Sequence, residues 1–590
     1  MCGIYGYIGS KNASGVVVDG LKRLDYRGYD SWGIAVVNDS GIQITKDVGV
    51  VKDIPADSLP KSEIGIGHTR WATHGAVTVV NAHPHLATDG SFALAQNGIV
   101  ENYKELKKNL SEKGYRFISE TDTEVIVRLV EEELKTEKDI KLAIEKAFEK
   151  LEGRNTIIAV TKEGEIIAAR NGSPLVIGKN TQTNEIYISS DVLSFAPYVD
   201  TICVLDNMQM ILAKKGRIQL FDVVSKKEIM PHFEKLELKS NQVDKGEYEH
   251  YMLKEIMETP QTLEALLESN VEKLDSASEM LKKAHTVYTI GSGSAGIASS
   301  QIAFYLREHA KINAIHLVGA DANEYTPLFS ENDLIIAPSQ SGETADVLEV
   351  LEVAKKKNVK IISYVNMPGS MMSRISDVAF LSNAGPEVCV MSTKVFTSQM
   401  AWGYYLSKIA EGKKIEAQNN IRNLINAMKS YLGDSKNHES IRGLAHILLK
   451  NRDIFLLGKH QNYAVIQEGM VKIIEGTYKH AHALPAGDLK HYAITLMEKG
   501  VPVIAVYSDD NIKSDIANAI SQVKARGATV IGIGPVKLDN LDQYLSVPET
   551  GETSGIMNII PLQLLAYYTA KELGNNIDKP RNIAKSVTVK

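Results

Sequence analysis

Cys2 is the residue with the clearest chemical potential. Removal of Met1 would leave a cysteine with a free α-amino group. An α-amine with a pKa of about 7.7–8.0 is suited to act as general base for its own thiol. Taken alone, Cys2 is more simply a small buried residue at the start of a strand. Motifs further along the chain decide between the two interpretations.

Three motifs supply what an attacking thiolate would need. The guanidinium of Arg70 could hold an α-carboxylate in a bidentate fork. Asn97 and Gly98 offer a side-chain amide and a backbone N–H, the donor types of an oxyanion hole. Asp122 could accept an α-ammonium group. Each has a simpler explanation, because Asn-Gly is typical of a hairpin turn and Asp122 or Thr121 of a helix cap. Together they indicate hydrolysis of a free amino-acid amide.

Two histidines flank a proline, in His83-Pro84-His85. An HxH pair suggests a metal site, but neither a carboxylate nor a cysteine stands at ligand spacing. We therefore expect these residues to pack structurally, and we expect no metal.

In the C-terminal half, a serine-rich turn follows a buried strand and opens a helix. This turn, residues 339–344, offers hydroxyls, an amide and a helix N-terminus, which together form a phosphate cradle without lysine. A capping turn would need only one hydroxyl. The glycine-rich turn at residues 291–296 is not a Walker A loop, because no Gly-Lys-Ser/Thr follows it.

Later in the chain, Glu468, Lys472 and Glu475 fall on one face of an expected helix at residues 463–475. An exposed salt-bridge row is at least as good an explanation as catalysis. His491 follows a loop, where a lone histidine is usually just packed or solvated. Lys585 lies among small residues in the C-terminal tail and could reach a carbonyl substrate.

The bulk properties are those of a folded protein of several domains. With 590 residues, three or four domains are expected. Apolar residues make up 44% and charged residues 23%, and the net charge of −6 indicates neither a nucleic-acid surface nor a membrane surface. Three widely spaced cysteines argue against a disulfide framework. With no signal sequence and no long apolar run, the cytoplasm is expected.

The elements that must position these residues differ between the two halves. Short β-like runs interrupted by two helices, at residues 14–24 and 123–134, predict an α+β layered domain of the αββα type over residues 2–235. A polar stretch, residues 236–249, reads as a linker. The expected strands are at residues 3–8, 33–37, 64–68, 92–95, 156–160, 185–188 and 202–205.

The remainder of the chain repeats itself. Apolar strands at residues 287–291, 334–338 and 361–362 recur 167 or 169 residues later. Helical stretches alternate with them, which predicts two α/β domains with doubly wound parallel sheets, at residues 250–430 and 431–577. Residues 578–590 are a tail that we expect to complete the second site.

Several N-terminal segments closely resemble the N-terminal-nucleophile glutamine amidotransferases: MCGIYGYIG, LDYRGYDSWG, GHTRWATHG, NAHPH, NGIVENY and SETDTEV. The resemblance implies that Cys2 attacks glutamine and that Asn97 and Gly98 stabilise the oxyanion. It also implies a gating role for Trp71 on the ammonia path. The residues implied to bind glutamine are Arg70, Trp71, Thr73, His74, Gly98 and Asp122.

The C-terminal segments SQSGETAD, MSTKVFT, LKH and DKPRNIAKSVTV resemble sugar-isomerase (SIS) domains. Over the full chain the pattern is similar to the isomerizing glutamine–fructose-6-phosphate transaminases. The resemblance implies transfer of ammonia to fructose 6-phosphate, giving glucosamine 6-phosphate and glutamate, in a homodimer without cofactor. The residues implied to surround the sugar phosphate are Ser294, Ser339, Gln340, Ser341, Thr344, Ser392 and Lys472.

The same resemblance assigns three catalytic groups. Lys585 would open the sugar and form a Schiff base with the C2 carbonyl. Glu475 would move a proton between C1 and C2. His491 would assist ring opening from the partner subunit.

A few positions depart from the family pattern. Ala295 replaces a common serine, Tyr492-Ala493 replaces Gly-Pro, Gln96 replaces histidine, and Trp32 replaces a small residue. Two other functions therefore stay open: an amidotransferase acting on another sugar phosphate, and a non-catalytic sensor of sugar phosphates. A sensor would need neither Lys585 nor Glu475.

Overall fold

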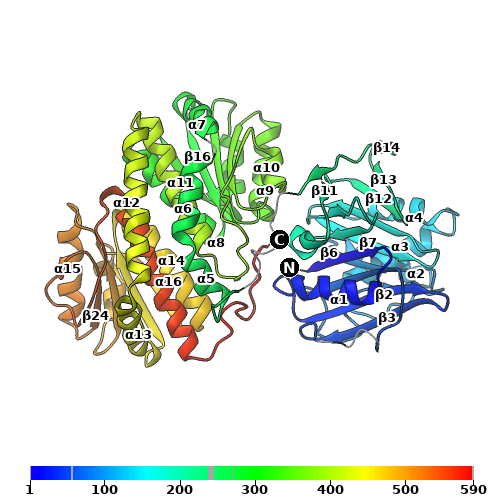
Figure 1. Cartoon of the computed structure of the whole chain (residues 1–590), viewed down its shortest axis with the longest axis horizontal. Helices are drawn as coiled ribbons and strands as arrows, with labels where there is room; N and C mark the ends of the chain where they lie inside the picture. The colour runs from blue at the N-terminus through cyan, green and yellow to red at the C-terminus, as the bar shows by residue number, and fades with distance from the viewer. Residues whose placement is uncertain (1, 53, 55–57, 237–244, 270, 588–590) are drawn as a thin grey trace. The chain divides into compact units, whose positions relative to one another are not determined.

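The computed structural model describes residues 2–52, 54, 58–236, 245–269 and 271–587. The chain forms two units, Met1–Gln242 together with Ala584–Lys590, and Val243–Ile583 (Figure 1). Most of the predicted linker, residues 237–244, lies outside the described residues, and residues 245–249 contain no helix or strand. The second unit then begins with a helix at Tyr251.

Two antiparallel sheets form the core of the first unit. One sheet has the order β15-β11-β9-β10-β1-β4-β2-β3, and the other has the order β14-β13-β12-β8-β7-β6-β5. Strands of the first sheet are β1 (Gly3–Ile8), β2 (Ser31–Asn38), β3 (Gly41–Val48), β4 (Ile64–Arg70), β9 (Val176–Lys179), β10 (Ile186–Ser189), β11 (Thr201–Val204) and β15 (Glu234–Lys235). Those of the second are β5 (His85–Leu86), β6 (Phe92–Gly98), β7 (Asn155–Thr161), β8 (Ile166–Asn171), β12 (Gln209–Lys214), β13 (Arg217–Asp222) and β14 (Lys227–Ile229).

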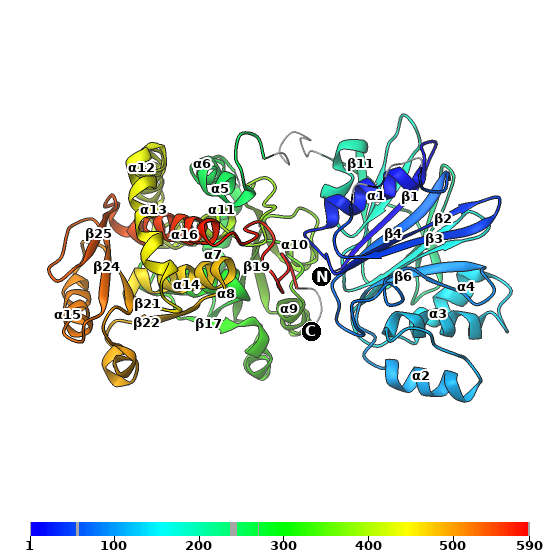
Figure 2. The same ribbon diagram turned by 90° about the horizontal axis from the view of Figure 1, so that it is seen from below.

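Helices cover the outer faces of these sheets. Alternating apolar residues such as Ile4 and Ile66 from one sheet and Ile158 and Val160 from the other pack together between the sheets. On the far face of the second sheet, α2 (Tyr103–Glu112), α3 (Asp122–Glu133) and α4 (Ile140–Glu149) bury their apolar sides. Helix α1 (Ala13–Leu24) packs on β1 and β4 of the first sheet (Figure 2). The predicted αββα layering is confirmed.

The second unit contains two parallel five-stranded sheets of the same topology. Their orders are β17-β16-β18-β19-β20 and β22-β21-β23-β24-β25. The first is built from β16 (Val287–Gly291), β17 (Ala314–Val318), β18 (Leu334–Ser339), β19 (Lys360–Val365) and β20 (Val378–Leu381). The second is built from β21 (Asp453–Gly458), β22 (His480–Pro485), β23 (Pro502–Val506), β24 (Thr529–Gly534) and β25 (Gln543–Ser546). The predicted repeat of doubly wound domains is confirmed.

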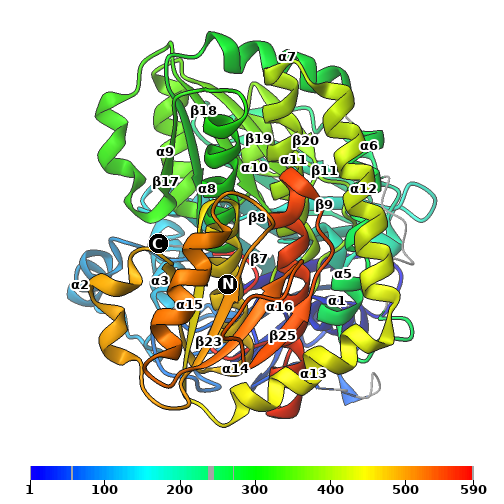
Figure 3. The same ribbon diagram turned by 90° about the vertical axis from the view of Figure 1, so that its left-hand side faces the viewer.

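The two parallel sheets share one hydrophobic core, which runs from Met252 to Ile577. Helix α16 (Ser554–Glu572) is buried over nearly its whole length and packs against α13 (Ser435–Leu449) and α14 (Tyr463–Thr477) (Figure 3). The other helices are α5 (Tyr251–Met257), α6 (Thr259–Glu268), α7 (Val271–Lys283), α8 (Gly293–Glu308), α9 (Ala345–Lys356), α10 (Met371–Ile375), α11 (Lys394–Glu411), α12 (Lys414–Gly433) and α15 (Lys513–Lys524).

One boundary differs in detail from the pattern-based division. Helix α12 runs through residue 430, so the transition between the two repeats is helical and has no loop at that point. No described helix is long and apolar enough to cross a membrane.

A glycine in α1 provides a test of the packing. A Cβ at Gly20 would lie 2.3 Å from the ring of Tyr5, which is fully buried in β1, whereas a Cβ at Gly15 would have no atom within 4 Å. Gly20→Ala should therefore lower the free energy of unfolding by about 1–3 kcal/mol. Gly15→Ala in the same helix should be neutral or stabilise by up to about 1 kcal/mol. Thermal unfolding of both variants checks this, and equal midpoints would contradict it.

Candidate active sites

The thiol of Cys2 lies directly before β1 and faces the turn that follows β4. The Trp71 backbone N–H donates to Sγ at 3.3 Å, and Sγ lies 3.6 Å from the Trp71 carbonyl oxygen. Burial raises the pKa of the Cys2 thiol, while the Trp71 hydrogen bond and the charge of Arg70 oppose this increase. The turn itself is held by Asp30, whose carboxylate accepts from the Ala72 N–H at 2.8 Å.

The predicted oxyanion donors stand at the end of β6, beside Cys2. Asn97 Nδ2 donates to the Cys2 carbonyl oxygen at 3.1 Å, and Asn97 Oδ1 lies 3.2 Å from His68 Nε2. Gly98 has φ +132°, and a Cβ there would lie 2.0 Å from the Arg154 carbonyl oxygen. Only glycine fits this position.

Arg70 organises the loop that was predicted to bind glutamine. Its guanidinium donates to the carbonyl oxygens of His74, Gly75 (3.0 Å) and Ala76 (3.2 Å). A guanidinium has five N–H donors, so these three bonds leave donors for a carboxylate. Thr73 in the same loop is exposed, and the His74 ring meets the Tyr103 ring edge-on at 5.0 Å.

Two acidic residues at the start of α3 hold this region together. Asp122 is buried and accepts from the Val100 N–H at 2.8 Å, which ties α3 to the turn after Gly98. Burial raises the pKa of Asp122, and the Val100 bond opposes that shift. Glu120 accepts from the Ala76 N–H and from Asn81 Nδ2, both at 3.0 Å. Sequence reasoning did not single out Glu120, because nothing in the local pattern shows that it reaches the loop.

The remaining polar residues behind the site have structural partners. His83 packs between His68 and His85, with ring centroids at 4.3 and 5.2 Å. Gln96, at the position where the family usually has histidine, donates to Asn155 Oδ1 at 2.7 Å and accepts from the Thr123 hydroxyl at 2.5 Å. Trp32 is buried within β2.

In the second unit, the predicted phosphate cradle closes on its own backbone. The Gly342 N–H donates to Ser339 Oγ at 2.9 Å, and the Glu343 N–H donates to Ser341 Oγ at 3.1 Å. Gly342 has φ +65° and packs against Ser370. Gln340 and Thr344 lie half-buried on the same turn, and Thr344 precedes α9 directly. The turn thus lies directly before the N-terminus of α9, and its role in binding phosphate stays a prediction.

Helix α14 carries the predicted acid–base row, and this row is buried. Lys472 Nζ lies 3.3 Å from Glu468 Oε1 and 2.6 Å from Glu475 Oε2. The side chains of Glu468 and Lys472 are fully buried, whereas that of Glu475 is 23% exposed. An exposed salt-bridge row is therefore ruled out for these residues. Glu475 is the member that solvent or a substrate can reach.

Ser294 on α8 completes the row, because its hydroxyl donates to Glu468 Oε1 at 2.9 Å. Burial raises the pKa of Glu468 to about 7, although Lys472 pulls it down. Burial by itself would lower the pKa of Lys472, but Glu468 and Glu475 raise it above its ordinary value. The ammonium therefore stays charged beside Glu475.

Ser392 precedes α11 and belongs to a segment held by buried carboxylates. Its hydroxyl donates to Glu387 at 3.0 Å, and Glu387 also accepts from the Thr393 and Val395 N–H groups. Asp578 accepts from the N–H groups of Tyr251 and Met252, each at 3.0 Å, and its own carbonyl oxygen accepts from Val390. The start of the C-terminal tail is thus fixed beside the Ser392 segment, a link that sequence reasoning missed.

Two predicted residues are not gathered with the others inside the second unit. His491 is exposed at the end of the 3₁₀ turn η7 (Leu489–His491). Lys585 follows Ile583, where the second unit ends. The tail before it passes the end of α14, where the Arg581 N–H donates to the Tyr478 hydroxyl at 3.0 Å and its guanidinium lies 4.2 Å from the centre of the ring.

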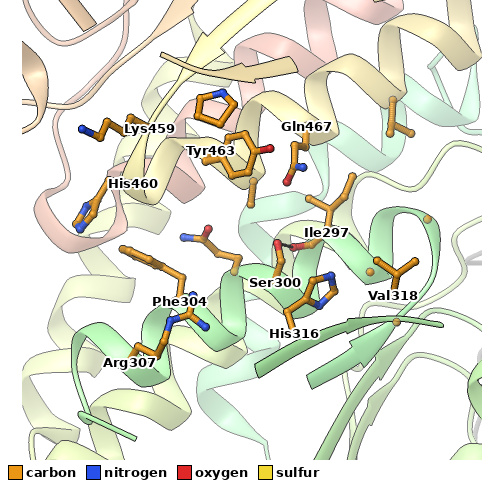
Figure 4. Close-up of a pocket in the computed structure, with 17 residues that line it drawn as sticks. Ile297, Ser300, Phe304, Arg307, His316, Val318, Lys459, His460, Tyr463 and Gln467 are labelled. Atoms are coloured by element: carbon orange, nitrogen blue, oxygen red, sulfur yellow. Dashed lines mark hydrogen bonds between the residues drawn. The ribbon is translucent and has the colours of Figure 1, made fainter. Parts of the chain in front are cut away.

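A pocket of about 730 Å³ lies between α8 and α14 and reflects the internal repeat (Figure 4). Its lining includes residues 297, 300, 304 and 318 of the first repeat and their counterparts 167 residues later. By the same offset, Gln301, Tyr305 and Glu308 correspond to Glu468, Lys472 and Glu475. Asp509 and Asp510 stand where the phosphate turn has Gln340 and Ser341. One repeat thus carries the predicted phosphate turn, and the other carries the row formed by Glu468, Lys472 and Glu475.

Comparison with known proteins identifies the domains. A glutamine amidotransferase domain family matches residues 68–196, and the SIS domain family matches residues 280–407 and 447–572. The C-terminal domain of glucosamine-fructose-6-phosphate aminotransferase from Francisella tularensis superimposes with a TM-score of 0.53 at 30% identity, covering 57% of this chain and all of that one. Fold and site together define an amidotransferase with two SIS domains.

Relatives of full length specify the family further. The chain is 37% identical to glutamine--fructose-6-phosphate aminotransferase [isomerizing] of Caldanaerobacter subterraneus subsp. tengcongensis and 36% identical to the enzyme of that name from Pyrococcus horikoshii. Both alignments cover the whole of both chains. The protein belongs to the family of isomerizing glutamine–fructose-6-phosphate aminotransferases.

The buried carboxyl group of Glu468 gives a pH-dependent prediction. Its pKa of about 7 in the folded state lies above the ordinary value of 4.5, so protonation favours the folded protein. Stability from this group is present below pH 4.5 and is lost as the pH rises to about 7. The free energy of unfolding should therefore fall between pH 5 and pH 8 in the wild type. In Glu468→Gln this fall should be smaller by on the order of 1–3 kcal/mol. Thermal unfolding against pH measures this, and an unchanged pH slope would contradict it.

Proposed function

We propose that this protein hydrolyses glutamine in its first unit and transfers the ammonia to fructose 6-phosphate in its second, with isomerisation to glucosamine 6-phosphate. The main observation behind this proposal is that relatives with this activity in their names align over the whole chain. Five of them are 35–37% identical to it. The chain also has both sets of chemical groups, the Cys2–Asn97–Gly98 cluster and the Lys472–Glu475 pair.

In the first unit, the Cys2 thiolate attacks the side-chain amide carbon of glutamine. Asn97 Nδ2 and the Gly98 N–H are the donors for the resulting oxyanion, which is supported by their position beside Cys2. Ammonia leaves with a proton, and water then releases glutamate from the thioester. Arg70 holds the α-carboxylate and Asp122 the α-ammonium group, and the loop with Trp71, Thr73 and His74 lies over the substrate.

In the second unit, the phosphate turn with Ser339, Gln340, Ser341 and Thr344 binds the sugar phosphate, with Ser294 and Ser392 nearby. Lys585 adds to the C2 carbonyl and expels water, forming a Schiff base, and ammonia then displaces Lys585. Glu475 takes a proton from C1 and returns it to C2, converting the ketose imine to the aldose amine. Lys472 supports this role because its ammonium, 2.6 Å away, favours the carboxylate form of Glu475.

Chain length supports the role of Lys585. Arg581 is fixed on Tyr478, the residue that follows α14 and lies three positions after Glu475. Lys585 is four positions further along the chain, and four residues span at most about 14 Å. The lysine thus follows an anchored part of the tail closely, which supports its assignment to the sugar site.

We also propose that the protein is a homodimer in which His491 serves the partner subunit. His491 is exposed on its own subunit. Apolar side chains near the edge strands β17 and β22 are exposed as well: Val318 at 54%, Leu328 at 66%, Tyr492 at 49% and Leu496 at 54%. A second copy would cover this surface and bring His491 to a site that lacks it.

The three free cysteines support a reducing compartment, as expected for the cytoplasm.

The proposed division of labour is tested by separating the two reactions. With glutamine and fructose 6-phosphate, the wild-type enzyme should form glutamate and glucosamine 6-phosphate in equal amounts, as measured by mass spectrometry. Cys2→Ala should abolish both products but retain hexosamine formation from ammonium. Glu475→Gln should lower hexosamine formation by at least about 100-fold with either nitrogen source. Glutamate without amino sugar from the wild type would overturn the proposed acceptor.

The dimer is tested by mixing inactive subunits. A Glu475→Gln subunit and a His491→Ala subunit, refolded or co-expressed together, should form mixed dimers with one intact site. Random pairing should then restore up to about a quarter of wild-type activity, because half the dimers are mixed and each has one working site of two. No recovery in dimers shown to be mixed would mean that His491 acts within its own subunit.

A further inference from the structure

The amide of Asn97 must present the correct end to the substrate. Its Nδ2 can donate to an oxyanion, whereas its Oδ1 would repel one, and the two ends have nearly the same shape. A half-turn of the side chain would therefore place an acceptor where negative charge develops. Something other than shape has to select the orientation.

The contacts of Asn97 define that orientation. Nδ2 faces the Cys2 carbonyl oxygen at 3.1 Å, and a carbonyl oxygen can only accept. Oδ1 faces His68 Nε2 at 3.2 Å. Because Oδ1 can also only accept, Nε2 of His68 must carry a hydrogen. His68 and Asn97 are 0% and 1% exposed, so water does not compete for this bond.

The surroundings keep the His68 ring uncharged. Burial, followed by the nearby Arg70, lowers the pKa of His68 to about 3. His83 packs on its face and His85 lies beyond, and burial lowers the pKa of both rings well below the ordinary value. His85 Nε2 contacts the hydroxyl of Thr121 at 2.9 Å, directly before α3. The row of neutral rings thus surrounds His68 without adding positive charge beside the thiol.

We propose that His68 is a positioning residue for glutamine hydrolysis: its Nε2–H holds Asn97 Oδ1 and so keeps Nδ2 directed at the oxyanion. Among the described contacts His68 has no hydrogen bond to Cys2, and it acts through Asn97. This inference rests on the proposed hydrolysis of glutamine by Cys2, because Asn97 has this role only there. The hydrogen bond to Asn97 would explain, beyond packing, why the GHTRWATHG segment has an imidazole at position 68.

Three substitutions separate the hydrogen bond from packing. His68→Leu removes the donor and keeps an apolar side chain of moderate size. His68→Gln retains an amide N–H about as far from the backbone as Nε2. His83→Leu is the matched control, because His83 is also buried and its ring packs against that of His68, but it has no hydrogen bond to Asn97 among the described contacts.

The measurement is glutamate release by the full-length enzyme with fructose 6-phosphate present. His68→Leu should lower kcat about 10–100-fold and change the KM for glutamine less than threefold, because Arg70 and Asp122 are untouched. His68→Gln should recover to within about fivefold of wild type, and His83→Leu should stay within the same range. Hexosamine formation from ammonium should be unchanged in all three variants, which shows that they are folded.

A double substitution tests whether His68 acts through Asn97. Asn97→Ala should lower kcat about 10²–10³-fold, and adding His68→Leu should lower it no further. With glutamate release by the wild type established, three results would overturn the role of His68 and leave the proposed function intact. The first is a wild-type kcat for His68→Leu. The second is a loss of kcat in His68→Gln or in His83→Leu as large as that in His68→Leu. The third is a loss in the double variant that equals the sum of the two single effects in free energy.

Discussion

The fully buried ammonium of Lys472 is the constraint around which the second unit is arranged. An isolated charge without solvent costs several kcal/mol, so Lys472 needs both carboxylates of its own helix within reach. Spacings of four and three residues on α14 provide them, but only while the helix is intact. Glu468 in turn needs the Ser294 hydroxyl, which comes from the other repeat. The two repeats must therefore pack together before the acid–base row is satisfied, and the single hydrophobic core that they share secures this packing.

In the first unit, carboxylates order the candidate site by accepting hydrogen bonds from backbone N–H groups. Asp30 holds the turn beside the thiol, Glu120 holds the loop after Arg70, and Asp122 holds the turn after Gly98. Each bond joins a loop to a rigid element, so the groups around Cys2 are ordered by contacts that lie far apart in the sequence. Loops that carry chemistry on such a scaffold need such anchors, since a loop has no ladder of backbone hydrogen bonds to order it.

The sequence predicted the architecture well because its strongest signals are periodic. The buried parallel strands and the 167-residue offset identified both α/β domains, and the short β-like runs identified β1, β4, β6 and β7. Strands β3 and β13 were missed because they are largely half-exposed and lack continuous apolar runs. Site residues with a motif were found, whereas His68, Glu120 and Asp578 act through long-range contacts that no local pattern reveals. The buried state of Glu468 was likewise invisible, because an i, i+4, i+7 row of charges looks the same on a surface.

The unequal repeats have a consequence for how this enzyme can change over time. A symmetric ancestor with two copies of one domain would have had two equivalent sites, each built from one phosphate turn and one acid–base helix. Here Asp509 and Asp510 occupy the positions of Gln340 and Ser341 in one turn, and Gln301 and Tyr305 occupy those of Glu468 and Lys472 in one helix, while Glu308 keeps the acidic residue at the position of Glu475. With the proposed roles, each repeat supplies a part of the site that the other lacks, so neither can be replaced by a copy of its neighbour. Duplication of a domain usually leaves one copy redundant, but with these roles both copies are needed.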